Sequence, residues 1–256
     1  MSAVRVGIAG AGGRMGQALL EAASATEGVA LGSAVDLAPG NWGNVAIGTD
    51  VSAAIGACDV LIDFTRPAGT LEHVRACVAA RCPIVIGTTG FSTAQVEEIR
   101  RAAASIAIVM APNMSVGVNV MMKLVELGSR ALGEAYDVEV FEMHHRKKVD
   151  APSGTALKLG EVAANARGAG LAEVGVFDRH GATGERRPGS MGFSVARGGD
   201  IVGDHTVFFA GTGERIEITH RSTSRATYSQ GAMRAARFLA GRAPGLYDMQ
   251  DVLGLR

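Results

Sequence analysis

The chain has no excess of either charge. Its 256 residues include 25 Lys and Arg against 25 Asp and Glu, a formal net charge of +0 at pH 7. A nucleic-acid-binding protein that depends on bulk positive charge is therefore not expected. A local cluster of basic residues can still bind a small anion.

Cysteine is scarce and lacks a metal-binding or redox pattern. The three cysteines, Cys58, Cys77 and Cys82, form no CxxC pair. This spacing excludes the common thiolate metal motifs and fits a reducing compartment. We expect no metal site.

Long apolar runs are also missing. The apolar stretch from Val4 to Ala11 is short and interrupted by glycine, so it does not resemble a signal peptide, and no other run reaches membrane-spanning length. We expect a cytoplasmic protein that does not enter a membrane. The hydrophobic share of 47% is typical of a globular protein, and the length allows one large domain or two modest ones.

The first 36 residues follow the order of a dinucleotide-binding unit. An apolar strand at residues 4–9 leads into GAGGRMG at 10–16, and a helix is predicted from Gln17 to Ser24. A second strand, Val29 to Val35, ends at Asp36. Glycines allow a tight turn that brings a pyrophosphate to the helix N-terminus, and the acid meets the ribose hydroxyls.

The same strand and helix alternation continues to residue 115. Strands are predicted at 58–64, 83–86 and 106–110, with helices at 68–80 and 92–104, the latter capped by Ser92. Such alternation predicts an α/β fold with a Rossmann-like, doubly wound parallel sheet. Ligands bind such sheets beyond the carboxyl ends of the strands, where Thr65, Gly87–Gly90 and Ala111–Met114 lie.

The pattern changes after Ser115. A long helix is predicted at 116–132, then a strand at 137–143, a helix at 153–167, and three strands at 191–197, 205–210 and 215–223. Strands without intervening helices indicate a second, α+β domain with an open mixed sheet. A final helix at 228–240 returns the chain to the first domain, so the predicted domains are 1–115 with 226–256, and 116–225. Residues 168–188 are expected to form an exposed loop.

The segment from Glu142 to Leu157, EMHHRKKVDAPSGTAL, concentrates the reactive side chains. Two histidines, His144 and His145, follow the predicted strand and can exchange protons near neutral pH. A run of cations comes next, and Ser153-Gly154-Thr155 opens a helix whose free backbone N–H groups can bind an anion. A small polycarboxylate that is protonated during its reaction would suit this segment.

Five motifs occur in one order along nearly the whole chain: GAGGRMG at 10–16, VIGTTGF at 85–91, APNMSVGVNV at 111–120, HHRKKVDAPSGTAL at 144–157, and GDIVGDHTVFF with ERIEITHRSTSR at 199–225. Together they closely resemble dihydrodipicolinate reductase, also called 4-hydroxy-tetrahydrodipicolinate reductase. The glycine motif alone is a weak signal, whereas HHR-x-K-x-DAPSGTA is close to diagnostic. The resemblance implies NAD(P)H-dependent reduction of a cyclic dicarboxylate in the diaminopimelate and lysine pathway, with loss of water.

The resemblance also implies roles for individual residues. His144 matches the proton donor and acceptor of the family, and Lys148 matches its second proton donor. His145, Gly154 and Thr155 match the groups that hold the substrate carboxylates. The matches to the cofactor contacts are Gly10, Ala11, Gly12, Gly13, Arg14, Met15, Asp36, Gly87, Thr88, Thr89, Ala111, Pro112, Asn113 and Met114. His205 and His220 could face the same pocket or be ordinary sheet histidines, and we leave them outside the predicted site.

One position departs from the family pattern. Leu37 follows Asp36 where many relatives carry Arg, so the 2′-phosphate of NADPH would lack its usual cation and would face a carboxylate. The sequence favours NADH, or use of both cofactors with Arg14 as a substitute cation. The family is typically a homotetramer joined through the sheets of its substrate domains, which is the expectation for this chain.

Other functions remain open from the residues alone. Another two-domain dehydrogenase, such as an aspartate or homoserine dehydrogenase, would share the first domain but has no need of HHR-x-K with PSGTA. A semialdehyde dehydrogenase needs a cysteine nucleophile near a base, a setting that none of the three cysteines has. A non-catalytic nucleotide sensor would not need His144 and Lys148.

Overall fold

The computed structural model describes residues 3–224 and 226–256. It forms two compact units, one of Met1–Val116 with Ala226–Arg256 and the other of Gly117–Arg225. Within the described residues, no helix is long and apolar enough to cross a bilayer. The two units are described separately.

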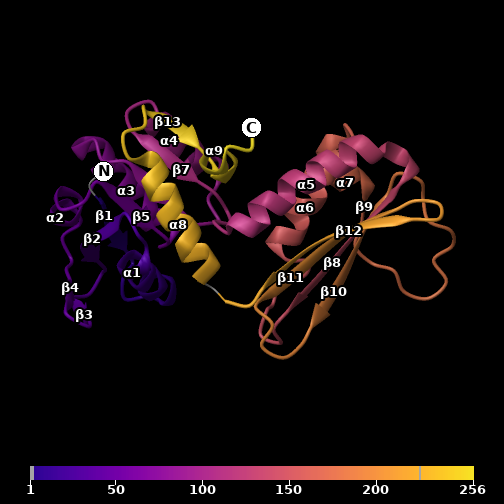
Figure 1. Ribbon diagram of the computed structural model, residues 1–256, viewed down its shortest axis with the longest axis horizontal. Coiled ribbons are helices and arrows are strands. Elements are labelled where there is room, and N and C mark those ends of the chain that lie inside the picture. Colours follow the sequence, from indigo (N-terminus) through magenta and orange to yellow (C-terminus); the bar gives the residue numbers. More distant parts are fainter. Residues whose placement is uncertain (1–2, 225) are drawn as a thin grey trace. The chain divides into compact units, whose positions relative to one another are not determined.

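The first unit is built on a parallel sheet of six strands (Figure 1). Their order across the sheet is β13-β7-β6-β5-β1-β2. The strands are β1 (Val4–Ala9), β2 (Val29–Val35), β5 (Val60–Asp63), β6 (Ile84–Ile86), β7 (Ala107–Met110) and β13 (Gly245–Tyr247). Strands β5 and β6 and the last four residues of β1 are fully buried, as central strands of a covered parallel sheet must be, whereas the edge strands β2 and β13 are partly exposed.

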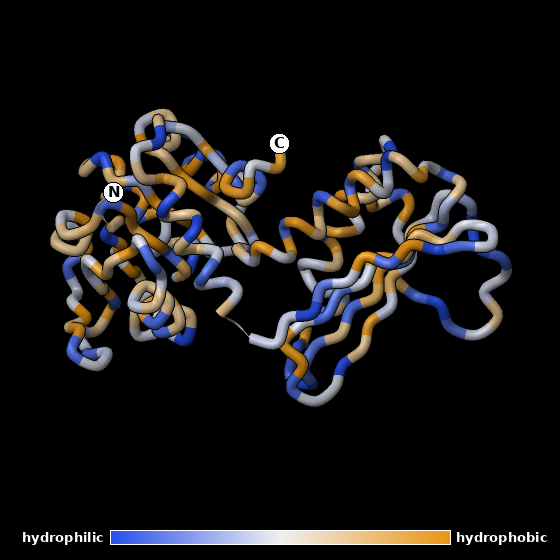
Figure 2. Tube along the Cα trace, viewed as in Figure 1, coloured by the Kyte–Doolittle hydropathy of each residue, from blue (hydrophilic) through white to orange (hydrophobic). Residues whose placement is uncertain are grey.

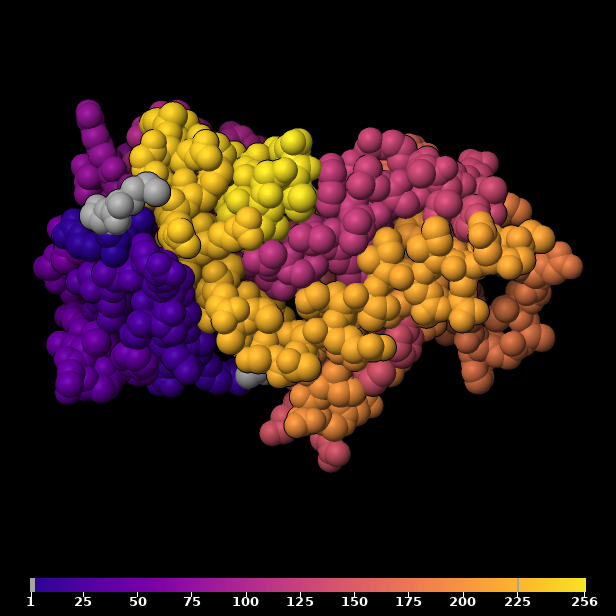
Figure 3. Space-filling view, viewed as in Figure 1, coloured from indigo at the N-terminus to yellow at the C-terminus, as the bar shows by residue number. Residues whose placement is uncertain are grey.

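Helices cover both faces of this sheet, and each face has its own core. The helices are α1 (Arg14–Ala25), α2 (Val51–Gly56), α3 (Pro67–Ala80), α4 (Thr93–Ala102), α8 (Ala226–Leu239) and α9 (Met249–Leu253). One core joins α1, α8 and α9 to the sheet, and the other joins α2, α3 and α4. In Figure 3 the C-terminal residues, in yellow, lie against the purple residues of this unit. The predicted doubly wound α/β fold is confirmed.

The second unit contains a mixed sheet in the order β12-β11-β8-β10-β9. Its elements are α5 (Val116–Leu132), β8 (Asp137–His144), α6 (Gly154–Ala166), α7 (Leu171–Val174), β9 (Gly175–Val176), β10 (Met191–Arg197), β11 (Gly203–Ala210) and β12 (Arg215–Ser222). Strand β8 pairs parallel with β10 and antiparallel with β11. The predicted mixed sheet is therefore confirmed.

Strand β8 decides which side chains face the helices. Alternate residues are buried, and Val138 and Val140 join a core with residues of α5 and α6. Because side chains alternate along a strand, Glu142 and His144 lie on that same face at the carboxyl end of β8. Strand β8 therefore places the Glu142 carboxylate and the His144 imidazole at the edge of this core.

Several short elements differ from the sequence-based expectation. Residues 168–188 are not a continuous loop, because they include α7 and β9, while the segment after β9 extends away from the sheet (Figure 2). The strands β3 (Gly40–Trp42) and β4 (Val45–Ile47) form a hairpin that was not predicted, and α2, β13 and α9 were also missed. Elements of three to six residues carry too few periodic positions to be recognised from sequence.

Candidate active site

The glycine turn after β1 is closed by close backbone contacts. Gly10 has a φ of 74°, and the N–H groups of Gly10 and Ala11 both donate to the Val35 carbonyl, at 2.9 and 3.1 Å. A Cβ on Gly16 would lie 2.1 Å from the Gly10 carbonyl oxygen, so only glycine fits there. The N-cap of α1, Gly13, makes no side-chain capping bond. This N-terminus has the form of a phosphate-binding helix start.

Asp36 is fixed beside this turn. One carboxylate oxygen accepts the Gly12 N–H at 2.8 Å, and the other accepts the Leu37 N–H at 2.6 Å. The structure therefore brings Asp36 to the glycine turn, as a dinucleotide site requires. The side chain of Leu37 is 100% exposed and leaves an apolar surface beside the carboxylate.

A buried carboxylate, Asp63, links the next two loops of this unit. It is 0% exposed, at the carboxyl end of β5. Its Oδ1 accepts from the N–H and hydroxyl of Thr65, both at 2.7 Å, and from the hydroxyls of Thr70 and Thr88, at 3.1 and 3.3 Å. Its Oδ2 lies 2.6 Å from Nδ1 of His73. Asp63 thus fixes Thr88, one of the predicted cofactor residues, and was not singled out from the sequence.

The loop after β7 is held from two sides. Asn113 Oδ1 accepts the Ser115 N–H at 2.9 Å, and the Ala111 N–H donates to the Ile86 carbonyl at 3.2 Å. A Cβ at Gly231 of α8 would lie 1.8 Å from the Met114 carbonyl oxygen. The third predicted cofactor loop therefore depends on a glycine near the end of the chain.

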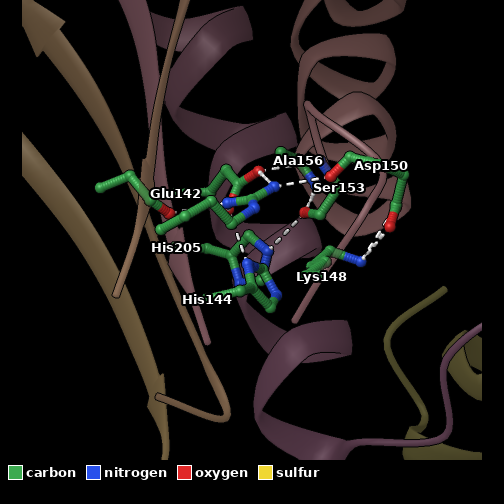
Figure 4. Close-up of polar contacts among 9 residues, drawn as sticks. Glu142, His144, Lys148, Asp150, Ser153, Ala156 and His205 are labelled. Carbon is green, nitrogen blue, oxygen red and sulfur yellow. Dashed lines mark hydrogen bonds and ion pairs between the residues drawn. The ribbon is translucent and has the colours of Figure 1, made fainter. Parts of the chain in front are cut away.

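In the second unit, four donors converge on Glu142 (Figure 4). Arg197 donates to both carboxylate oxygens, at 2.7 and 2.8 Å, and the Ser153 N–H donates at 2.9 Å. Nδ1 of His144 lies 2.6 Å from Oε2. Burial raises the pKa of Glu142, but the donors, led by Arg197 and His144, outweigh burial and hold that pKa below its usual value.

Strand register explains how distant residues meet here. Arg197 of β10 stands beside His144, and His205 of β11 stands opposite Glu142. The His144 and His205 rings meet edge to face, with centroids 5.1 Å apart. His205, which the sequence left open between a site residue and an ordinary sheet histidine, has its Nε2 3.0 Å from the Ser153 hydroxyl.

Ser153 is the N-cap of α6. Its hydroxyl accepts the Ala156 N–H at 3.2 Å, and the helix begins at Gly154, where an added Cβ would meet nothing within 4 Å. The open position of Gly154 and the capped turn that includes Thr155 give α6 the N-terminus that was predicted to bind an anion.

His205 is neutral at physiological pH. It is 5% exposed, and burial, reinforced by the neighbouring His144, lowers the pKa of His205 to about 4. A neutral imidazole can accept or donate one hydrogen bond at Nε2, depending on its tautomer. His205 therefore supports the helix cap without adding a charge beside His144.

Lys148 pairs with the carboxylate of Asp150. Its ammonium lies 2.8 and 2.9 Å from the two oxygens of Asp150, and the Lys148 ammonium holds the pKa of that carboxyl below its usual range. Arg197 also donates to the Asp150 carbonyl at 2.7 Å. The His145 N–H donates to the Ile201 carbonyl at 2.8 Å, which fixes the start of the loop.

The fold and these two sites define the class of protein. The first unit has a parallel sheet with a glycine turn and a following acid, which is the form of a dinucleotide site. The second unit has a histidine, a lysine and a helix N-terminus close together (Figure 4). This combination is typical of a pyridine-nucleotide-dependent oxidoreductase. Residues 4–114 match the family model of the dihydrodipicolinate reductase N-terminus, and residues 117–253 match that of its C-terminus. The chain belongs to the dihydrodipicolinate reductase family.

Individual relatives agree with this assignment. The 4-hydroxy-tetrahydrodipicolinate reductase of Bordetella pertussis is 59% identical, over 98% of this chain and 97% of the relative. That of Nitrosospira multiformis is 54% identical over the full length of both chains. Among solved structures, the dipicolinate-bound dihydrodipicolinate reductase from Paenisporosarcina sp. TG-14 is similar with a TM-score of 0.78 and 25% identity, covering 97% of this chain and 98% of that one.

Proposed function

We propose that the protein is a 4-hydroxy-tetrahydrodipicolinate reductase. It reduces (2S,4S)-4-hydroxy-2,3,4,5-tetrahydrodipicolinate, with loss of water, to (S)-2,3,4,5-tetrahydrodipicolinate, using NAD(P)H, in the diaminopimelate and lysine pathway. The observation that carries the proposal is the cluster of Glu142, His144 and Ser153 at the end of β8, in a chain with full-length relatives of that name.

The first unit fits the cofactor. The glycine turn, in which Gly16 lies against the Gly10 carbonyl, ends at the start of α1, where a pyrophosphate would bind, and Asp36 beside the turn would meet the ribose. The dinucleotide would be held by the turn of residues 10–15, by Asp36, and by the loops at 87–89 and 111–114. The bound nicotinamide supplies a hydride for the substrate ring.

The second unit would hold the substrate and supply the proton. The N–H groups of Gly154 and Thr155, with His145, would bind a carboxylate and orient the ring. Reduction moves electron density toward the ring nitrogen. Nδ1 of His144 faces Glu142, and Nε2 makes no hydrogen bond with the residues that the structure describes. His144 is the proposed proton donor, with Lys148 as the second.

Lys148 is proposed to exchange its ion pair with Asp150 for one with the substrate. Its ammonium is bound by Asp150, so a substrate carboxylate would compete with that side chain. The surface ion pair between them is weak enough for a charged ligand to replace. Lys148 would therefore turn toward the substrate only when the dicarboxylate is present.

Cofactor choice is proposed from the surroundings of Asp36. Both of its oxygens already accept backbone N–H groups, and Leu37 offers no charge to a 2′-phosphate. NADH is the favoured cofactor, and NADPH would depend on the exposed Arg14. A cytoplasmic homotetramer joined through the mixed sheets is the proposed assembly.

Product analysis tests the proposal. The substrate is made from pyruvate and aspartate semialdehyde by a synthase, and the products are identified by mass spectrometry after incubation with NADH. The proposed function predicts tetrahydrodipicolinate. Reduction of aspartate semialdehyde alone, without the synthase, would instead indicate a homoserine dehydrogenase.

A further inference from the structure

Glu142 is a buried charge that the proposed chemistry does not use directly. Its side chain is 1% exposed and lies within a unit whose core is apolar. Burying a carboxylate costs several kcal/mol unless it is paired and hydrogen-bonded. Here the pairing is complete, because Arg197 donates to both oxygens and two further groups donate one bond each.

The contact with His144 determines where that ring carries its proton. An ionised carboxylate can only accept, so Nδ1 of His144 must be the donor across the 2.6 Å contact. The two-point contact with Arg197 keeps Glu142 ionised. Nε2 is then the only ring nitrogen left to exchange a proton, and the plane of the ring is fixed.

The second oxygen of the same carboxylate reaches the anion site. Oε1 accepts the Ser153 N–H at 2.9 Å, and Ser153 caps α6. One side chain therefore sets both the direction of the imidazole and the place of the helix start. The spacing of a proton donor and a carboxylate site determines how a bound ring is presented to the donor.

We infer that Glu142, clamped by Arg197, is a positioning residue: it keeps a proton on Nδ1 of His144, so that the imidazolium gives up its Nε2 proton and is left as the Nδ1–H tautomer, and it fixes the α6 N-terminus relative to that ring. The expected effect on kcat rests on the proposed function. The tautomer of His144 can be measured without any substrate.

The chain offers a matched control on the same strand. Glu139 of β8 is also bound at both oxygens by one arginine, Arg179, at 2.7 and 2.9 Å, and it contacts Arg186 as well. Three residues before Glu142, it lies on the other face of the sheet, away from His144. Glu139→Gln therefore breaks a similar charge pair without touching the site.

The test compares Glu142→Gln with Glu139→Gln. We expect Glu142→Gln to lower kcat about 10–100-fold, the usual cost of losing a group that orients a reactive histidine, with NADH affinity within about twofold of the parent. Glu139→Gln should leave kcat unchanged. Nitrogen-15 spectra of histidine-labelled protein, with His144 assigned from the His144→Gln variant, should show the Nδ1–H tautomer in the parent and in Glu139→Gln, and its loss in Glu142→Gln.

Two outcomes would overturn the inference: kcat of Glu142→Gln equal to that of Glu139→Gln, or an unchanged His144 tautomer in Glu142→Gln. Glu142→Gln could unfold because Arg197 is left without its carboxylate. In that case the double variant E142Q/R197M removes both charges, and its kcat and its His144 nitrogen-15 spectrum test the inference instead. If the parent protein does not reduce the dicarboxylate, the proposed function is wrong. The tautomer measurement still tests whether Glu142 positions His144.

Discussion

The two units each contain a buried carboxylate at the end of a strand, Asp63 in the first and Glu142 in the second. Both are at most 1% exposed, and both lie 2.6 Å from Nδ1 of a histidine. They differ in their other partners. Asp63 is surrounded by threonine hydroxyls and a backbone N–H, whereas Glu142 is clamped by a guanidinium.

This difference corresponds to what each unit is proposed to do. Neutral donors are enough for Asp63 to tie together the loops after β5 and β6, which would hold a cofactor through backbone and hydroxyl groups. Glu142 instead stands beside an imidazole proposed to exchange protons, and a permanent cation keeps the carboxylate ionised while it does so. Substitutions at the site in the second unit should therefore lower kcat, and substitutions around Asp63 in the first unit should raise the dissociation constant of the cofactor.

The sharpest test of this division is His144→Gln in the second unit. Removing a positioned proton donor should lower kcat about 10²–10⁴-fold, while the dissociation constant of NADH stays within about twofold, because the cofactor loops belong to the first unit. Stopped-flow turnover and NADH fluorescence titration measure the two quantities. His180→Gln, on an exposed loop, is the control. Equal losses in turnover and NADH binding would contradict the role of His144.

Acid should weaken the second unit through His205. The folded pKa of about 4 lies below the ordinary 6.5, so between these values the unfolded chain binds a proton that the folded protein does not. Stability from this group falls as pH drops from 6.5 to about 4, by roughly 3 kcal/mol.

The variant His205→Gln keeps a group that can bond to the Ser153 hydroxyl but removes the titration. Urea unfolding at several pH values should show a shallower acid loss in His205→Gln than in the parent. His180→Gln, whose side chain is exposed, should retain the parent slope. Parallel pH profiles for the parent and His205→Gln would show that burial of His205 does not carry this effect.

In the first unit, Asp63→Ala should weaken both the fold and cofactor binding. The methyl group accepts no hydrogen bond, which leaves the buried hydroxyls of Thr65, Thr70 and Thr88 without their shared acceptor and costs roughly 1–3 kcal/mol. Because Thr65 and Thr88 lose their anchor, the dissociation constant of NADH should rise, while kcat at saturating NADH stays near that of the parent. A drop in kcat at saturating NADH with unchanged affinity would remove the contrast with Glu142.

The smallest expected effect is on cofactor choice. Leu37→Arg places a cation beside Asp36 at a fully exposed position, where a charged contact contributes roughly 1 kcal/mol and should raise the NADPH to NADH preference roughly fivefold. Leu37→Gln is the neutral control. The ratio of kcat/KM for the two cofactors is the measurement, and an unchanged ratio in Leu37→Arg would show that preference is set elsewhere.

Much of the fold could be predicted because its signals are local. Alternating strands and helices, the glycine turn and the Ser92 cap each occupy a few neighbouring residues, and Ser92 does form a capping box with Gln95. The predicted helix at 116–132 has the observed bounds of α5. The hairpin β3–β4 was missed because three-residue strands have no readable period.

The candidate site could be predicted only in part, because its supports are distant in sequence. His144, Gly154 and Thr155 stand in one motif, but Arg197 and His205 reach it through the pairing of β8 with β10 and β11. That register is a property of the folded sheet. Glu142 did leave a signal, since a charged residue two positions before His144 on a strand must share its face.

The most direct test of the account is steady-state oxidation of NADH and NADPH by the parent protein, measured side by side. The substrate is made in the cuvette from pyruvate and aspartate semialdehyde by the synthase. The account predicts that NADH is consumed only when the synthase is present, and faster than NADPH. If both cofactors bind but neither is consumed, the protein is a nucleotide-binding sensor and the catalytic roles proposed for the second unit are wrong.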